Sequence, residues 1–210
     1  NTILLYIRML FTMVISLYTS RVILQVLGAD DFGIYNVVGG VVVLFSFLTN
    51  AMTSSTQRFL NYNFGLKNES KVSHIFNVSI LTHFTIFLLV LLLSETVGLW
   101  FVMTQLNIPV GRETATMWVY QMSVVTTLIG IMVIPYRASI IAAERMSIFA
   151  YVSILEVALK LVVVLVLSYM SFDNLVMYSI LLTLVAMLNF FIYQIECRRK
   201  LSYKIPFCLG

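Results

Sequence analysis

The sequence contains little charge and few cysteines. Only 10% of its 210 residues are charged, whereas 60% are hydrophobic, and a soluble domain has about 25% charged residues. A soluble core of this size cannot bury so much apolar surface, which excludes an ordinary soluble domain. The two cysteines, Cys197 and Cys208, match no metal-binding or redox spacing. The net charge of +4 does not indicate nucleic-acid binding, because the basic residues lie at helix ends and between helices.

The sequence also lacks the residue groupings that enzymes use. It contains no phosphate-binding glycine loop, no nucleophile triad and no cluster of metal ligands, and His74 and His83 are isolated. An enzyme acting at a membrane surface is expected to have a local group of carboxylates or histidines. We therefore predict no enzymatic activity, no metal and no cofactor.

What the sequence does contain is a series of long apolar runs. Runs of about 20 apolar residues match the hydrocarbon thickness of a bilayer, and these runs do not alternate as the strands of a membrane β-barrel do. They predict an all-α membrane protein, a bundle of transmembrane helices. The predicted spans cover residues 2–27, 34–64, 72–97, 113–136, 147–170 and 174–197.

Two features within or between these runs predict interruptions. Pro135 is expected to kink or end the fourth span, because proline removes a helical hydrogen bond. The segment 97–108 contains Trp100 and Phe101 and is typical of an interfacial segment, where aromatic rings lie at headgroup level.

A short acidic turn, the elbow of residues 28–33, separates the first two spans. Gly28 and Gly33 are expected to bracket it, since glycine adopts a positive φ at low cost. Asp30 and Asp31 can cap the helix that follows and favour its positive N-terminal end. The elbow therefore predicts an antiparallel hairpin of the first two helices.

Basic residues are concentrated in alternate joins between the spans. One set of joins has the acids Asp30, Asp31 and Asp173 beside Arg112 and the near-interfacial Arg21. The other set carries Lys67, Lys71, Arg137, Arg145, Arg198, Arg199, Lys200 and Lys204. Because cytoplasmic joins carry the excess of Lys and Arg, the elbow is expected outside and both ends of the chain inside. The basic segment 198–210 is expected to begin a cytoplasmic linker.

Polar and small residues form one narrow face of the second span, at about 100° per residue. They are Asn36, Gly39, Ser46, Asn50, Ser54, Gln57 and Asn61, with Arg58 at the edge. Such a face can be a seam between helices or the wall of a hydrated cavity. The length of this polar stripe favours the cavity.

Arg8 and Arg21 lie on nearly opposite faces of the first span. Arg8 lies about two turns into the apolar run, where its guanidinium can hold a phosphate through paired hydrogen bonds or can snorkel to the interface. Arg21 is interpreted as an anchor at the outer interface or a partner of the elbow carboxylates, with ligand contact as the alternative.

Charged and polar residues of the later spans allow two interpretations. Glu156 and Lys160 are spaced i, i+4 near the middle of the fifth span and can pair. The pair is either structural or a coupling or substrate-contact site whose charge state changes during transport. Two further faces are interpreted as packing faces: Thr116, Ser123, Thr127, Gly130 and Arg137 on the fourth span, and Asn189, Tyr193 and Glu196 on the sixth.

The elbow and the helix after it resemble a known family. Residues 27–40, Leu-Gly-Ala-Asp-Asp-Phe-Gly-Ile-Tyr-Asn-Val-Val-Gly-Gly, resemble the first loop and second helix of bacterial polysaccharide exporters. Residues 135–146 and 151–161 are similar to later parts of the same proteins. Over essentially its whole length the chain resembles the O-antigen-type lipid-linked oligosaccharide flippases, whose superfamily includes the multidrug and toxin extrusion transporters.

The resemblance implies a six-helix lobe of a two-lobe exporter. Residues 1–197 would be the N-terminal lobe, with a C-terminal lobe as its partner. The implied activity is movement of an undecaprenyl-diphosphate-linked oligosaccharide across the bacterial inner membrane by alternating access, for surface polysaccharide biosynthesis such as that of lipopolysaccharide O antigen. Arg8 and Arg58 would neutralise the diphosphate. The glycan would contact Asn50, Ser54, Gln57 and Asn61.

The same resemblance leaves partners and alternatives open. Implied partners are the lipid-linked substrate, membrane lipids, and a polysaccharide polymerase and glycosyltransferases. A cation-coupled multidrug antiporter of the same superfamily is one alternative, and it predicts acidic residues in the cavity. A membrane scaffold lobe that transports nothing is the other, and it predicts a native chain without a second lobe.

Overall fold

The computed structural model describes residues 2–44, 47–66, 69–169 and 172–201. These residues are almost entirely helical, which confirms the all-α prediction for this part of the chain. The helices are α1 (Thr2–Leu44), α2 (Phe47–Gly65), α3 (Glu69–Leu93), the π-helical turn η1 (Ser94–Gly98), α4 (Leu99–Gln105), α5 (Glu113–Ala142), α6 (Met146–Leu167) and α7 (Asn174–Leu201).

Five helical segments of the described chain are long and apolar enough to cross a membrane. They are Leu5–Val42, Ser70–Gln105, Glu113–Ala142, Met146–Leu167 and Asn174–Arg199. Large apolar side chains on their outer faces are exposed, such as Leu81 (66%) and Leu92 (63%) on α3. Soluble proteins rarely expose continuous apolar faces, so these helices are typical of a multi-pass membrane protein.

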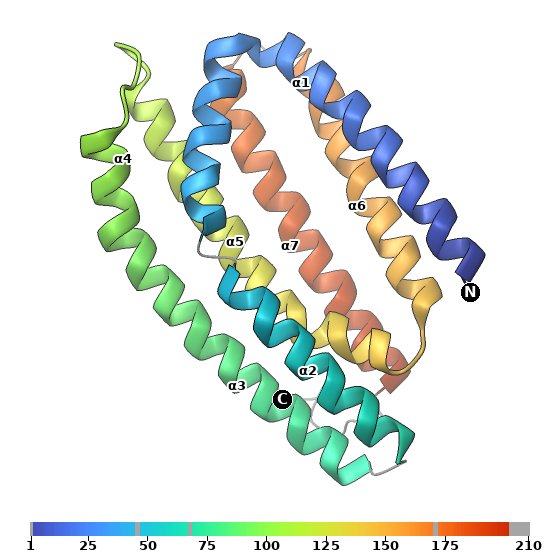
Figure 1. Cartoon of the computed structure of the whole chain (residues 1–210). Coiled ribbons are helices and arrows are strands. Elements are labelled where there is room, and N and C mark those ends of the chain that lie inside the picture. The colour runs from blue at the N-terminus through green and yellow to red at the C-terminus, as the bar shows by residue number, and fades with distance from the viewer. Residues whose placement is uncertain (1, 45–46, 67–68, 170–171, 202–210) are drawn as a thin grey trace.

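The helices form an elongated bundle with α5 at its centre (Figure 1). α5 contacts α1, α2, α3, α6 and α7. Its side chains Val119, Tyr120 and Val124 are at most 1% exposed. The first part of α1 packs mainly against α6 and leaves most of its other side chains exposed, so it lies at the edge of the bundle.

The elbow is a sharp change of direction inside α1. Gly28 has φ 79° and ψ 172°, whereas its neighbours are helical. Figure 1 shows the first part of α1 rising to the elbow and the second part descending toward α2. Gly33 does not have a positive φ, so the prediction that two glycines bracket the turn was wrong: one glycine turns the chain, and Gly33 is already helical.

Substitution of Gly28 should therefore destabilise the protein much more than substitution of Gly33. A Cβ at either glycine meets no atom within 4 Å, so the difference comes from the backbone alone. The conformation of Gly28 is almost restricted to glycine, and Gly28→Ala should cost about 1–3 kcal/mol. Gly33→Ala should stabilise its helix by up to about 1 kcal/mol. Thermal unfolding in detergent measures both, and equal shifts would contradict this assignment.

The spans differ from the predicted ones in number and extent. The expected count of six is not confirmed, because the predicted second span, 34–64, is divided between the end of α1 and α2. The α2 sequence, rich in Thr, Ser, Asn and Gln, is too polar to qualify as a span by itself.

The predicted third span, 72–97, continues through η1 and α4 to Gln105, so residues 97–105 are helical and do not form a separate interfacial segment. The fourth continues through Pro135 to Ala142.

Three charged residues hold the loops together at the elbow end of the bundle. Arg112 precedes α5 and donates to Asp31 of the elbow at 2.6 Å and to Asp173 at 2.5 Å. Asp173 also accepts the backbone N–H of Leu175 at 3.1 Å and so caps α7. Arg112, and not Arg21, is therefore the partner of the elbow carboxylate; Arg21 lies on an exposed face of α1.

Asp31→Asn should destabilise this end of the bundle, and Asp30→Asn should not. The Asp31 side chain is 9% exposed and that of Arg112 is 38% exposed, so the ion pair is partly shielded from water and is worth about 1–2 kcal/mol. Asp30 is exposed. The expected decrease in Tm for Asp31→Asn is about 2–8 °C. An equal decrease in Tm for Asp30→Asn would show that the ion pair between Arg112 and Asp31 is not the source of the stabilisation.

Candidate functional site

A cavity of about 580 Å³ lies among α1, α5, α6 and α7. We call it the basic cavity. Its lining residues are Arg8, Tyr35, Thr126, Ile129, Gly130, Val133, Arg137, Phe149, Ser153, Glu156, Lys160, Tyr178, Leu182, Val185, Ala186, Asn189 and Tyr193. The volume lies within the range of small-molecule binding sites, about 300–1,000 Å³.

Arg8 is held against α6 with part of its guanidinium unsatisfied. Its Cζ lies 4.6 Å from the ring centroid of Phe149, within the range of a cation–π contact. Its Nη1 lies 3.4 Å from Ser153 Oγ, a long hydrogen bond. Its Nε is buried and has no hydrogen-bond partner among the described residues. A buried donor without a partner costs free energy, so Arg8 is suited to an anion that enters the cavity.

The charged pair of α6 also faces this cavity. Lys160 Nζ lies 2.6 Å from Glu156 Oε1, as the i, i+4 spacing predicts. Glu156 lies at the middle of α6, and the side chains of Lys160 and Glu156 are 44% and 35% exposed. The pair therefore borders an open cavity, where a ligand can reach both side chains, while in the structure each charge neutralises the other.

The basic cavity has an excess of positive charge. Arg8, Arg137 and Lys160 are cationic, and Glu156 is the one acid among its described lining residues. The positive charges come from three helices, so an anion in the cavity can interact with several cations at once. Low-dielectric walls strengthen such interactions.

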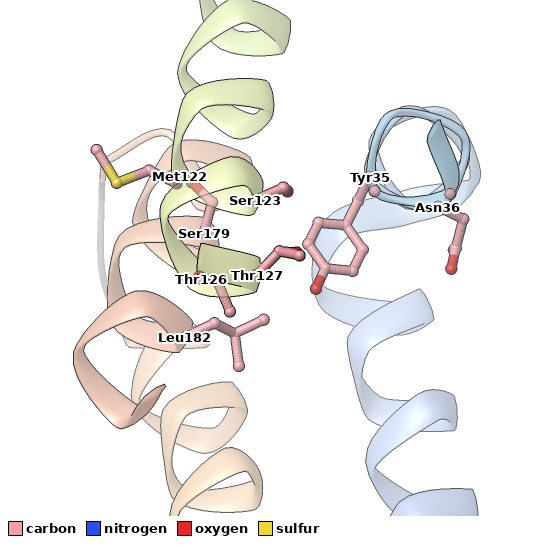
Figure 2. Close-up of a pocket in the computed structure, with 10 residues that line it drawn as sticks. Tyr35, Asn36, Met122, Ser123, Thr126, Thr127, Ser179 and Leu182 are labelled. Carbon is pink, nitrogen blue, oxygen red and sulfur yellow. The ribbon is translucent and has the colours of Figure 1, made fainter. Parts of the chain in front are cut away.

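A second cavity of about 370 Å³ adjoins the first on the side of the elbow. We call it the neutral cavity, because none of its described lining residues is charged. They are Tyr35, Asn36, Gly39, Gly40, Met122, Ser123, Thr126, Thr127, Ser179 and Leu182. Figure 2 shows Ser123 and Thr127 pointing from α5 toward the ring of Tyr35, with Asn36 beyond Tyr35 on the side away from α5.

Three residues line both cavities: Tyr35, Thr126 and Leu182. Tyr35 packs edge-to-face on Tyr178, with ring centroids 4.9 Å apart. Thr126 Oγ1 lies 2.9 Å from Thr183 Oγ1, which positions it between α5 and α7. The cavities are thus neighbouring compartments with a common wall and different chemistry.

The predicted site residues are only partly brought together. Arg8, Glu156 and Lys160 share the basic cavity, and the first residues of the polar stripe, Asn36 and Gly39, line the neutral cavity. The lower part of the stripe is not among the lining residues of either cavity: Ser54, Arg58 and Asn61 are exposed on α2, and Gln57 is half-buried. The side chain of Asn50 and residue Ser46 lie outside the described part of the structure.

Two faces that were interpreted as packing faces contain residues that line the cavities. The face of α5 with Ser123, Thr127, Gly130 and Arg137 was interpreted as packing, but these residues line the cavities. On α7, Asn189 and Tyr193 also line the basic cavity. A possible signal was Arg137 itself, since a charge on the small-residue face of a central helix is unfavourable against a packed neighbour.

Comparisons with models of protein families, with curated proteins and with solved structures yielded no match. The proposed function therefore rests on the geometry and lining chemistry of the two cavities, together with the resemblance of residues 27–40, 135–146 and 151–161 to the polysaccharide exporters.

Proposed function

We propose that the chain is a lobe of a membrane exporter that moves an anionic lipid-linked oligosaccharide, with an undecaprenyl diphosphate carrier, across the bacterial inner membrane. The observation that carries the proposal is the basic cavity, where Arg8, Arg137 and Lys160 surround a space large enough for a ligand. A diphosphate is a compact group with several negative charges, and arginine is suited to bind it through paired hydrogen bonds.

The cationic side chains of the basic cavity would neutralise the diphosphate during transport. Moving a diphosphate through hydrocarbon without compensation is prohibitively unfavourable. Arg8 would donate from its unsatisfied Nε and its weakly bound Nη1, while Arg137 and Lys160 would balance the remaining charge. The apolar carrier would stay in the bilayer beside the exposed helices.

A second lobe would complete the pathway by alternating access. The exposed α2 residues Ser54, Arg58 and Asn61 would then face that lobe, so Arg58 stays a candidate for substrate contact during passage. The elbow end would lie in the periplasm and the end with Arg145, Arg198 and Arg199 in the cytoplasm, as the charge distribution favours.

Proteoliposomes that contain the full-length native protein test this function. A fluorescent undecaprenyl-diphosphate-linked oligosaccharide is placed in one leaflet, and its arrival in the other leaflet is measured by quenching. We expect the protein to accelerate the transfer at least tenfold over empty vesicles. Transfer at the rate of empty vesicles would reject the proposal.

The carboxylate of Glu156 in the basic cavity favours a second candidate function, that of a cation-coupled multidrug antiporter. A cavity carboxylate can bind a proton, Na⁺ or a cationic drug. In the structure this carboxylate is neutralised by Lys160 at 2.6 Å, so we rank the anionic substrate first. Proton-driven efflux of a cationic dye from the same vesicles would reverse this order.

A further inference from the structure

We infer that the neutral cavity is the binding subsite for an uncharged sugar, namely the sugar attached directly to the diphosphate. The inference rests on the proposed function, because the diphosphate in the basic cavity determines where that sugar lies. Beyond the proposed function, the protein would have a second subsite, in which residues of α5 and α7 contact the sugar, and it would prefer neutral over acidic sugars.

The two cavities share a wall, as a sugar and its diphosphate require. A sugar and the diphosphate that carries it are joined by a single oxygen atom, so their subsites must be in direct contact. The basic and neutral cavities meet at Tyr35, Thr126 and Leu182. A glycosyl diphosphate with its phosphates near Arg8 and Arg137 can therefore extend its sugar across this wall.

The lining of the neutral cavity has the chemistry that suits a sugar. Sugars have hydroxyl edges and apolar CH faces, so they bind where hydroxyl or amide groups surround an aromatic ring. Ser123 and Thr127 present hydroxyl groups toward the ring of Tyr35 (Figure 2). Ser179 also lines the cavity, and its hydroxyl donates to the carbonyl of Val176 at 2.7 Å. Such a site combines an apolar surface with a few positioned polar groups.

None of the described lining residues of the neutral cavity carries a charge. A carboxylate on the sugar would lose water there without gaining a cationic partner, which is unfavourable. The cations that could compensate it lie in the basic cavity, where the diphosphate would already engage them. The site should therefore discriminate against a uronic acid of the same size.

Binding of three lipids to the full-length protein in detergent tests the inference. The probes are undecaprenyl diphosphate, the same lipid carrying one N-acetylglucosamine, and the same lipid carrying one glucuronic acid. We expect N-acetylglucosamine to tighten binding about tenfold over the sugar-free lipid, which corresponds to one or two net hydrogen bonds. Glucuronic acid should give no gain.

The double variant Ser123→Ala, Thr127→Val removes two hydroxyl groups with little change in volume. It should reduce the tenfold gain to about twofold or less. The matched control is Thr85→Val, on the exposed side of α3, where the hydroxyl group bonds only to its own helix at Leu81. Thr85→Val should preserve the full gain.

The outcomes separate this inference from the proposed function. If sugar-free undecaprenyl diphosphate binds and Arg8→Ala weakens it, but the sugar adds nothing or the double variant keeps the full gain, the sugar subsite is wrong and the anionic site stands. If the sugar-free lipid does not bind, the proposed function itself fails. Equal gains from glucuronic acid and N-acetylglucosamine would also overturn the subsite.

Discussion

Arg8→Ala in the full-length protein should lower the rate of lipid-linked oligosaccharide transfer by about tenfold to a hundredfold. Arg8 combines a buried Nε that has no hydrogen-bond partner in the described part of the chain with a long hydrogen bond to Ser153 at 3.4 Å, so it can donate to a ligand. Hydrogen bonds to charged groups contribute about 1.5–3 kcal/mol each, and about 1.4 kcal/mol corresponds to a factor of ten.

Two further variants show whether the loss of transfer rate arises in the basic cavity. Arg8→Lys keeps the charge but loses the paired donors and the planar contact with Phe149, so it should restore only part of the rate. Arg58→Ala removes an exposed arginine of α2 and should have a smaller effect than Arg8→Ala. Equal losses for Arg8→Ala and Arg58→Ala would mean that the basic cavity is not the main anion site.

Glu156→Gln should tighten binding of the diphosphate lipid about threefold to tenfold. The carboxylate neutralises Lys160 at 2.6 Å in the structure, and its removal leaves the lysine charge for the ligand. At an effective dielectric constant of about 20, a unit charge on the protein about 10 Å from a phosphate charge contributes about 1.7 kcal/mol to the binding free energy. Water in the cavity reduces this value, because the side chains of Lys160 and Glu156 are both more than a third exposed.

A charge cycle provides the controls for Glu156. Lys160→Met should weaken binding, and Glu156→Gln combined with Lys160→Met should return the affinity close to that of the unmodified protein. Glu95→Gln alters an exposed carboxylate of η1, outside both cavities, and should have no effect. Weaker binding of the lipid by Glu156→Gln would contradict an anionic site and favour a cationic substrate.

Local patterns predicted local features of this structure well. The low charge and long apolar runs predicted helices suited to a membrane, and the spacing of Glu156 and Lys160 predicted their contact. Gly28 was identified as the turn because a positive φ is a property of one residue and its neighbours. Gly33 was not distinguished from it, since a glycine is equally compatible with a helix.

Features that depend on distant parts of the chain were not predictable. Arg112 lies 81 residues from Asp31 in the sequence, and no periodic pattern joins a loop residue to an elbow. The face of α5 with Thr127 and Gly130 looks the same in sequence whether it packs on a helix or lines a cavity, because small and polar residues suit both. The number of spans was not predictable from apolar runs alone, since the predicted second span is divided between the end of α1 and the polar α2, which runs at an angle to it (Figure 1).

The proposed function depends on binding of the carrier diphosphate in the basic cavity. Its most direct test is the affinity of the full-length protein for sugar-free undecaprenyl diphosphate, compared with that of the Arg8→Ala, Arg137→Ala double variant and of Arg21→Ala, which removes an exposed arginine of α1. We predict that the double variant binds at least about a hundredfold more weakly and that Arg21→Ala binds normally. An affinity of the double variant equal to that of the unmodified protein would contradict binding of the diphosphate in this cavity.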